Sequence, residues 1–384
     1  MDGKSKEHIQ LLDLFRGVAI LGVFLFHCLG ASFGYDHLPW GRWLPVFPAS
    51  WPFLAVLPFT LGWAGVAVFF VVSGFCIHLS FLKSAQRDWR GFFVRRFFRI
   101  YPPYALALVL FAFVFAPTRL GFHSLIDWAQ IGSHALLLHN LDFRFFYGIN
   151  SAFWSIAVEA QLYLIYPLLL ALVDQFGWRR TLIFLCVLEC SLRGASDMFH
   201  FVTGHSLGCW LTDSPFCFWF SWAIGAALAD AFVRKRPLPF RSVSIVAVGV
   251  AAIATSFIRP LNSFSFLFFA LLTAATLARL LNRQVAAAQL RWPIAHLRKL
   301  GVVSYSFYLL HEPLVFSWGR LVRRLPLLEQ DRLLAFAMCL CGYPLIYLLA
   351  RLYYRTVEMR CIAAGKRVLQ KLRAHALPPA SSAV

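Results

Sequence analysis

Three ionisable residues lie inside stretches of sequence that are otherwise apolar. Arg16 and His27 share the run from 11 to 30, and Glu159 lies in a second run that begins at Phe153. A charged residue in a membrane-spanning helix costs ~2.5–3.5 kcal/mol on insertion scales, so one that persists usually faces a cavity or a partner. These positions therefore indicate chemistry in the interior of a membrane protein.

Arg16 and His27 are predicted to form a vertical pair on one helix. They are eleven residues apart, and eleven steps of ~100° return to nearly the same helical face with a rise of ~16 Å. Taken alone, Arg16 also fits a residue that pairs with Asp13 near the membrane edge, and His27 fits a core imidazole bonded to a carbonyl. Their shared face favours a functional interpretation of both.

Glu159 is expected to support His27. It lies a few residues into its own apolar run, which predicts a depth similar to that of His27. A carboxylate at that depth could orient an imidazole that acts as a general base. The alternative is a structural glutamate that is hydrogen-bonded or neutral.

Arginines and small residues mark two further segments. Arg96 and Arg99 are three apart, so they share a helical face and suit a phosphate-rich ligand, although an anchor that contacts lipid phosphates has the same pattern. In the glycine-rich run 62–75, Ser73 and Gly74 allow another helix or a ligand chain to approach. Ser73 has no base beside it in sequence, which argues against a nucleophile.

The composition requires a lipid environment. Of 384 residues, 60% are hydrophobic and 14% are charged, and the mean hydropathy of +0.68 lies outside the range of a soluble surface. The net charge of +19 comes from Lys and Arg between the apolar runs. That pattern sets membrane orientation and gives no basic face for nucleic acid.

The predicted fold is all-α, a polytopic bundle of about ten membrane helices, because each span uses ~20 residues. One membrane domain, 1–360, is followed by a short basic cytoplasmic tail, 361–384. The basic loops place both termini in the cytoplasm, with the basic segment 320–332 as the exception. The segment 124–141 is assigned to an interfacial or re-entrant helix on the outer side. The spans lie near 11–31, 61–82, 102–116, 153–173, 181–193, 216–233, 242–258, 264–281, 301–319 and 333–354.

Five ordered blocks of this sequence resemble the acyltransferase 3 family of membrane acyltransferases. They cover nearly the whole chain. The blocks are Leu12-Asp-Leu-Phe-Arg16 with His27 beyond it, Gly65-Val…Phe69-Phe…Ser73-Gly-Phe75, Arg95-Arg-Phe-Phe-Arg-Ile-Tyr-Pro102, Trp154-Ser…Glu159…Tyr163, and Gly301…Ser304-Tyr-Ser…Tyr308-Leu…His311.

The resemblance implies transfer of an acyl group, most often acetyl from acetyl-CoA, to a hydroxyl of a carbohydrate or glycolipid. In family terms His27 looks catalytic, Arg16 belongs to its motif, and Arg96 with Arg99 is associated with the donor. The acyl-CoA is a cosubstrate, so no bound cofactor and no metal are expected. The membrane is expected to be a bacterial inner membrane.

The buried charges and the family resemblance together predict one mechanism. Arg16, Arg96 and Arg99 hold the donor, and His27 either removes a proton from the acceptor or accepts the acyl group, supported by Glu159. Further residues are expected to line the substrate site, namely Ser73, Trp154, Tyr163, Tyr305 and His311. The rival class is a transporter or flippase that uses the buried Arg, His and Glu as a relay, although the chain shows no inverted halves.

Overall fold

The computed structural model describes residues 3–35, 38, 51–84, 87–258, 261–283, 292–324 and 331–376. Within these ranges the secondary structure is helical, and it includes no strand. Helices satisfy their backbone hydrogen bonds internally, which a lipid environment requires. Together with several long apolar helices, this makes the chain an integral, multi-pass membrane protein. Parts of two predicted loops, 284–291 and 325–330, and the end of the predicted tail, 377–384, lie outside the described residues.

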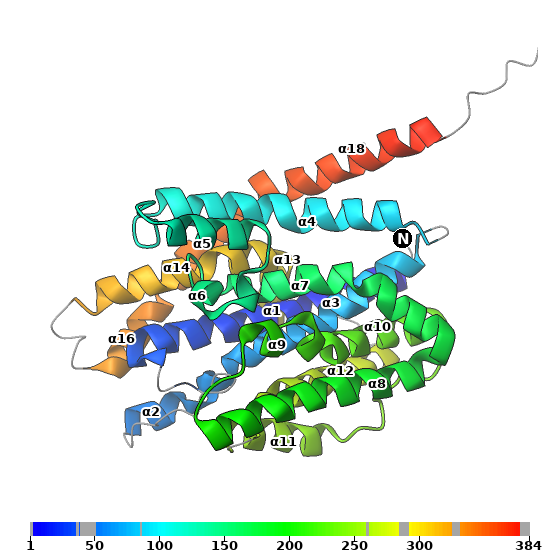
Figure 1. Ribbon diagram of the computed structural model, residues 1–384, viewed down its shortest axis with the longest axis horizontal. Helices are drawn as coiled ribbons and strands as arrows, with labels where there is room; N and C mark the ends of the chain where they lie inside the picture. Colours follow the sequence, from blue (N-terminus) through cyan, green and yellow to red (C-terminus); the bar gives the residue numbers. More distant parts are fainter. Residues whose placement is uncertain are drawn as a thin grey trace, which may run out of the picture.

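The centre of the bundle is formed by α1 (Gly3–Phe33), α3 (Gly65–Leu82), α10 (Trp219–Val233), α12 (Ser265–Arg283) and α14 (Ser304–Val322). Helix α3 packs against α1, α10 and α12, and α1 also packs against α14 and against the short helix α13 (Trp292–Val302). Figure 1 shows the ribbons of α1, α3, α10 and α12 running along the long axis of the molecule.

Glycines let the central helices approach to backbone contact, as the run 62–75 predicts. A Cβ on Gly74 would lie 2.1 Å from the carbonyl oxygen of Trp222, and one on Gly225 would lie 2.0 Å from that of Val71. These two glycines therefore fix the crossing of α3 and α10. Gly62 and Gly65 make similar contacts with α1.

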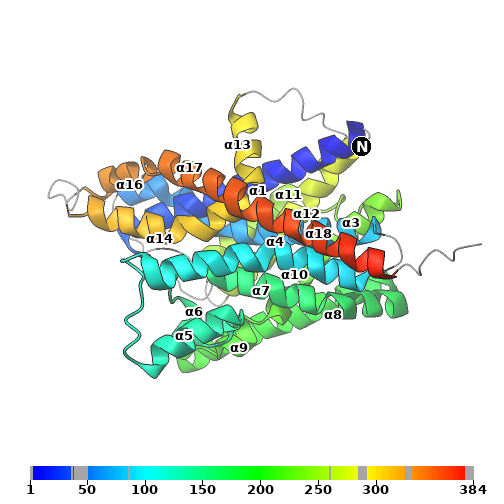
Figure 2. The ribbon, with the colours of Figure 1, turned by 90° about the horizontal axis from the view of Figure 1, so that it is seen from above.

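Two helices at the edge of the bundle begin or end away from the predicted boundaries. Helix α4 (Trp89–Val109) and the π-helical turn η3 (Leu110–Val114) form one rod, which starts thirteen residues before the predicted 102. The carboxylate of Asp88 caps it by accepting the Gly91 N–H at 2.7 Å, and this bond holds the pKa of Asp88 below its usual range. Helix α18 (Met359–Ala376) packs along α4, as Figure 2 shows, so most of the predicted tail is helical.

The predicted fourth and fifth spans form a broken helical pair. Helix α7 (Phe153–Leu164) ends at Ile165, and α8 (Tyr166–Thr203) contains Gly177 with a φ of +76°. That φ favours glycine because it has no Cβ. Figure 1 shows the green ribbon turning back there, so α8 consists of two segments that run in opposite directions.

The segment between α4 and α7 forms short helices. They are α5 (Leu125–Ala135), the turn η4 (His139–Leu141) and α6 (Phe143–Phe146). Helix α5 rises ~16 Å, about half of the hydrocarbon thickness, which is too short to cross. Its C-terminal end docks on α4 through Tyr104, whose hydroxyl donates to the His134 carbonyl at 2.9 Å.

Helices occupy all ten predicted ranges, but fewer of them qualify as membrane spans. Six described helices are long and apolar enough to cross a membrane, and the bent pair of α7 and α8 adds a seventh. Helix α11 (Ile245–Phe257) has only 13 residues, and α14, which carries His311, Glu312 and Arg320, is not among the seven. The remaining helices and turns are α2 (Trp51–Val56), η2 (Leu57–Ala64), α9 (Cys209–Thr212), η5 (Pro215–Phe218), η6 (Asn262–Phe264), α16 (Arg332–Leu340), α17 (Tyr343–Tyr353) and η8 (Tyr354–Glu358).

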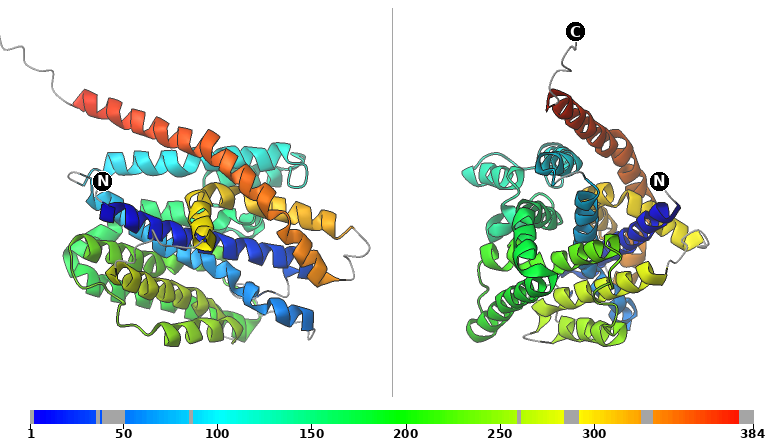
Figure 3. Two further views of the ribbon diagram at one scale, coloured as in Figure 1. Left: turned by 180° about the vertical axis from the view of Figure 1, so that it is seen from behind. Right: turned by 90° about the vertical axis from the view of Figure 1, so that its right-hand side faces the viewer.

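The two ends of the bundle differ. Helices α1 and α4 begin and α18 ends at the same end (Figure 1), which we call the basic end because Arg87, Arg90 and Arg373 lie there. Seen from this end, α18 runs along the edge of the bundle (Figure 3, right). Helix α14 runs toward the opposite end and α7 runs back toward the basic end.

We expect Gly225→Ala to force α3 and α10 apart, because the new methyl group would meet backbone atoms of Val71 and Phe75. Overpacking of this kind costs about 1–3 kcal/mol or more. The melting temperature of the detergent-solubilised protein should fall, and its size-exclusion peak should broaden.

Gly249→Ala is the matched control. Its nearest neighbouring atom is a Leu272 methyl carbon at 4.0 Å, so the melting temperature should stay the same or rise slightly, because alanine favours helix. Equal effects of the two substitutions would contradict the close-contact explanation.

Candidate functional site

A polar pocket lies between α1, α3, α4, α7 and α14. Its cavity volume is about 100 Å³, several times the ~10–15 Å³ that a single water needs. We call it the inner pocket. Its polar lining contains most of the predicted site residues, which are Arg16, Ser73, Arg96, Arg99, Glu159, Tyr163 and Tyr305, together with Ser155, Ser304 and Tyr308.

Of the three arginines that line the inner pocket, Arg16 and Arg99 have carboxylates near them. The Arg16 guanidinium contacts Asp13 at 3.2 Å, one turn earlier on α1, and its charge also interacts with that of Glu159. Arg99 lies close enough to Glu358 of η8 for their charges to interact. Acids from the beginning, middle and end of the chain thus balance part of the positive charge.

Arg96 is the least satisfied of these arginines. Its guanidinium carbon lies over the Phe92 ring, 5.9 Å from the centroid. Its Nε is buried, and it has no hydrogen-bond partner among the residues that the structure describes. A buried donor without a partner costs about 1–3 kcal/mol, and more when it is charged. An anionic ligand in the inner pocket would remove this cost.

Glu159 belongs to a hydrogen-bonded group on the wall of the inner pocket. Its Oε1 accepts the Ser73 hydroxyl at 2.5 Å and also accepts the Tyr163 hydroxyl. The Trp222 indole N–H in turn donates to Ser73 Oγ at 3.3 Å. The Ser73 hydroxyl is therefore positioned by a carboxylate, although its sequence neighbours include no base.

His27 lies outside the inner pocket, nearer the opposite end of α1. Its Nδ1 is 3.0 Å from the Tyr35 hydroxyl, and its ring centroid is 5.0 Å from that of His311. The Nδ1 of His311 bonds to the Tyr308 carbonyl, whereas its buried Nε2 has no hydrogen-bond partner in the described part of the chain. The predicted pair of Arg16 and His27 is thus divided: Arg16 lines the inner pocket and His27 packs with Tyr35 and His311.

Tyr308 lies between the inner pocket and the pair of His27 and His311. Its ring lines the inner pocket and packs against the His311 ring with centroids 5.3 Å apart. Its hydroxyl is 2.7 Å from that of Ser155, and Phe69 packs on its other edge. One layer of side chains therefore lies between the inner pocket and the two histidines.

The expected depth of Glu159 beside His27 is wrong. The expectation counted residues from the start of α7, as if that helix began at the membrane surface. Asn150 instead donates to the Leu309 carbonyl at 3.0 Å, so α7 begins deep inside the bundle, beside α14. Glu159, one turn beyond Ser155, consequently lies on the arginine side of Tyr308.

Comparison with known proteins identifies the family. Residues 9–351 match the acyltransferase domain of acyltransferase 3 proteins. The chain belongs to the acyltransferase 3 family. It is 23% identical over 350 residues to the peptidoglycan O-acetyltransferase OatA of Listeria monocytogenes, which covers 81% of this chain and 50% of that protein.

A second relative gives the same result. The O-acetyltransferase OatA of Staphylococcus aureus is 24% identical over 335 residues, with 81% of this chain and 51% of that protein covered. The chain thus spans about half the length of these curated relatives. No solved structure matches the chain.

The remaining predicted residues of this acyltransferase domain divide between sites. Ser73, Tyr163 and Tyr305 line the inner pocket, and His311 lies beside His27. Trp154 lines a different pocket, although the next residue, Ser155, lines the inner pocket.

Sequence reasoning missed Tyr35, Ser155, Tyr308 and Glu358. Glu358 is 1% exposed, and its Oε2 accepts the Ser306 hydroxyl at 2.6 Å. It ends η8, a π-helical turn, and such turns are frequent at functional sites. In the sequence it stands in a basic segment near the predicted tail, where nothing marks it as buried.

Glu358→Gln should destabilise the protein, because it keeps an acceptor for Ser306 but removes the charge that faces Arg99. Removing one of two interacting charges in the bundle interior leaves the other less compensated. We expect the melting temperature of the purified protein to fall by several degrees, as measured by intrinsic fluorescence.

Asp174→Asn provides the control, since its ion pair with Arg87 lies at the exposed surface and such pairs contribute about 0–1 kcal/mol. A Glu358 variant as stable as this control would show that Arg99 does not depend on the glutamate.

Proposed function

We propose that the protein is a bacterial inner-membrane O-acyltransferase that moves an acyl group, most often acetyl, from acyl-CoA to a hydroxyl of a carbohydrate or glycolipid. Its family membership and the names of its O-acetyltransferase relatives support the reaction class. The observation that carries the assignment of the donor is the convergence of Arg16, Arg96 and Arg99 on one pocket.

The proposed orientation follows the distribution of positive charge. The loop between α3 and α4, the Gly177 bend of α8 and the end of α18 lie at the basic end, and each carries Lys or Arg. The positive-inside rule assigns that end to the cytoplasm. Ten crossings with both termini inside then require α11, α14 and the two halves of the α7–α8 pair to cross individually.

The donor enters from the cytoplasm in this arrangement. Arg96 and Arg99 share one face of α4 and bind CoA phosphates by charge-assisted hydrogen bonds, while Arg16 adds a third positive charge. Arg16 and His27 are separated by ~16 Å along α1, which is the distance that the pantetheine arm bridges to bring the thioester toward the imidazole once the Tyr308 side chain moves aside.

The chemical step joins the acceptor hydroxyl to the acyl carbon. His27 removes the hydroxyl proton, the oxygen attacks the thioester carbonyl, the carbon–sulfur bond breaks, and the proton passes to the CoA thiolate. In a ping-pong route His27 first accepts the acyl group and then releases it to the acceptor. Tyr35 and His311, which contact the His27 ring, replace Glu159 as the groups that orient it.

Glu159 acquires a different role in this proposal. It bonds to Ser73 and Tyr163, and its charge offsets that of Arg16. We assign it to the positioning of the donor pocket rather than to proton transfer with His27.

His27→Ala should abolish most of the activity, because general-base catalysis contributes about 10²–10⁴-fold. Ester-linked acetate on the envelope glycan of host cells is the measurement, after membrane insertion of the variant has been confirmed. His123→Ala, at an exposed loop position, should leave acetylation unchanged. Full activity of the His27 variant would remove this residue from the mechanism.

Arg96→Gln and Arg99→Gln should each raise the KM for acetyl-CoA about tenfold or more, since a hydrogen bond to a charged group contributes about 1.5–3 kcal/mol. The KM for the acceptor should change little. Arg90→Gln is the control on the same helix, because Arg90 is exposed.

The measurement of acetyl-CoA and acceptor KM also tests the proposal against the alternative of a transporter or flippase. An effect of the Arg96 and Arg99 variants on the acceptor alone would refute their role in donor binding. Purified protein that transports a glycolipid but consumes no acetyl-CoA would favour a transporter or flippase instead.

A further inference from the structure

A second pocket opens near the end opposite the basic end, and the proposed reaction does not use it. It lies between α6, α7, α8, η5 and α12, and we call it the aromatic pocket. The rings of Phe146 and Trp154 stack with centroids 5.8 Å apart, Trp154 packs on Phe218 at 5.7 Å, and Phe218 packs on Phe266 at 4.9 Å. Aromatic walls with a few polar groups are typical of small-molecule sites.

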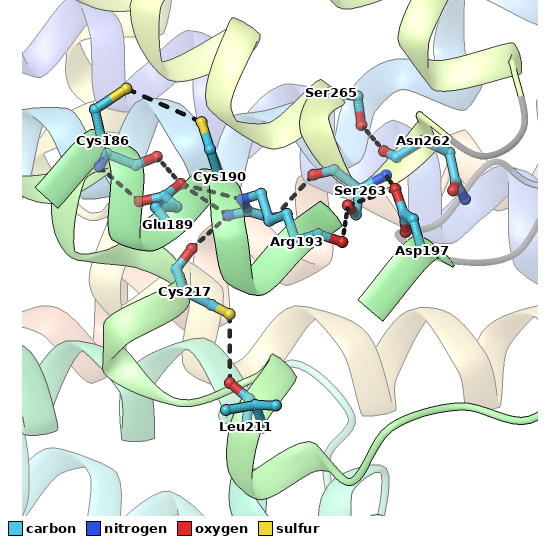
Figure 4. A network of polar contacts seen from close by, with 11 residues as sticks. Cys186, Glu189, Cys190, Arg193, Asp197, Leu211, Cys217, Asn262, Ser263 and Ser265 are labelled. Carbon is cyan, nitrogen blue, oxygen red and sulfur yellow. Dashed lines mark hydrogen bonds and ion pairs between the residues drawn. The ribbon is translucent and has the colours of Figure 1, made fainter. Parts of the chain in front are cut away.

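A buried ion pair fixes one wall of this pocket (Figure 4). Arg193 contacts Glu189, one turn earlier on α8, at 3.0 Å. Its other donors bond to the carbonyl oxygens of Ser263 at 2.9 Å and Cys217 at 2.6 Å. The guanidinium thus ties α8 to η5 and η6.

The same guanidinium also holds two rings of the wall. Its carbon lies 5.2 Å from the ring centroids of both Phe218 and Phe266, within the range of a cation–π contact. The aromatic wall is therefore held in place before any ligand binds, which lowers the entropy cost of binding.

The aromatic pocket also presents oxygen atoms. Ser196 is 3% exposed and lines the pocket, and its hydroxyl has no hydrogen-bond partner among the described residues. Across from it, the Thr212 hydroxyl bonds to the Asp213 carboxylate at 2.7 Å. A lipid tail would desolvate the Asp213 carboxylate without replacing its hydrogen bonds, and the negative charge of that carboxylate disfavours a phosphate. A neutral polyhydroxylated ring satisfies both the aromatic faces and the oxygens.

The aromatic pocket and the inner pocket share a wall. Phe70 lines the inner pocket, and its ring packs against Phe218 and Phe266. The consecutive residues Trp154 and Ser155 of α7 line one pocket each. A molecule in the aromatic pocket is thus separated from the inner pocket by one layer of side chains.

We propose that the aromatic pocket is a carbohydrate subsite, which binds a sugar unit of the acceptor at a distance from the unit that receives the acyl group at His27. This inference rests on the proposed function. It adds a second binding position for an acceptor that contains several sugar units. Acceptors with several sugar units then bind more tightly than a single unit.

The test compares acceptor fragments of different length. Fragments of the glycan that the host O-acetylates, one and several repeating units long, are offered with acetyl-CoA to the purified full-length protein in nanodiscs. The wild type should prefer the longer fragments in kcat/KM by roughly two- to tenfold, the range that one or two hydrogen bonds supply.

Two substitutions should remove this preference. Ser196→Val fills the subsite, and Tyr147→Ala removes a rim residue that is 45% exposed. Activity on the single unit and the KM for acetyl-CoA should stay at wild-type values. Ser196→Val replaces a buried hydroxyl that has no hydrogen-bond partner in the described part of the chain, so it breaks no hydrogen bond there.

Thr181→Val is the matched control, because Thr181 carries another buried α8 hydroxyl with no partner among the described residues and does not line the aromatic pocket. It should keep the preference for long fragments. The inference is overturned if the wild type has no length preference, or if both pocket variants keep it. Absence of transfer to every fragment would refute the proposed function itself.

Discussion

Positive charge buried among helices that face lipid is the constraint on which the rest of this structure depends. Arg16, Arg96 and Arg99 converge on one pocket, and a guanidinium cannot lose its proton to escape the cost of burial. Asp13, Glu159 and Glu358 offset part of that charge. These acids come from α1, α7 and η8. The arginine charges of the inner pocket are therefore offset only when distant parts of the chain have assembled.

The helical architecture was predictable because each long apolar run in the sequence predicts a helix that is buried in lipid. The close approach of helices at Gly62, Gly65 and Gly74 was also predictable, since small residues leave a visible pattern. Whether each helix crosses was harder to predict, because α7 and α8 break at Ile165 and Gly177 and α11 is short.

Depth was the part of the site that sequence reasoning could not supply. The positions of Arg16, Arg96 and Arg99 together follow from their motifs, but the level of Glu159 depends on where α7 begins. That level is set by Asn150 bonding to the Leu309 carbonyl, a contact across 159 residues. Glu358 escaped prediction for a similar reason, since its burial results from packing against α14 and not from its neighbours in sequence.

The layer around Tyr308 has a consequence for the membrane itself. A protein with polar cavities toward both faces of a bilayer would act as a pore for protons and ions if those cavities joined. The Tyr308 ring, its hydrogen bond to Ser155 and its contact with Phe69 form a septum of side chains between the inner pocket and the two histidines. Such a septum lets reactive groups approach from both faces while the electrochemical gradient across the membrane is preserved.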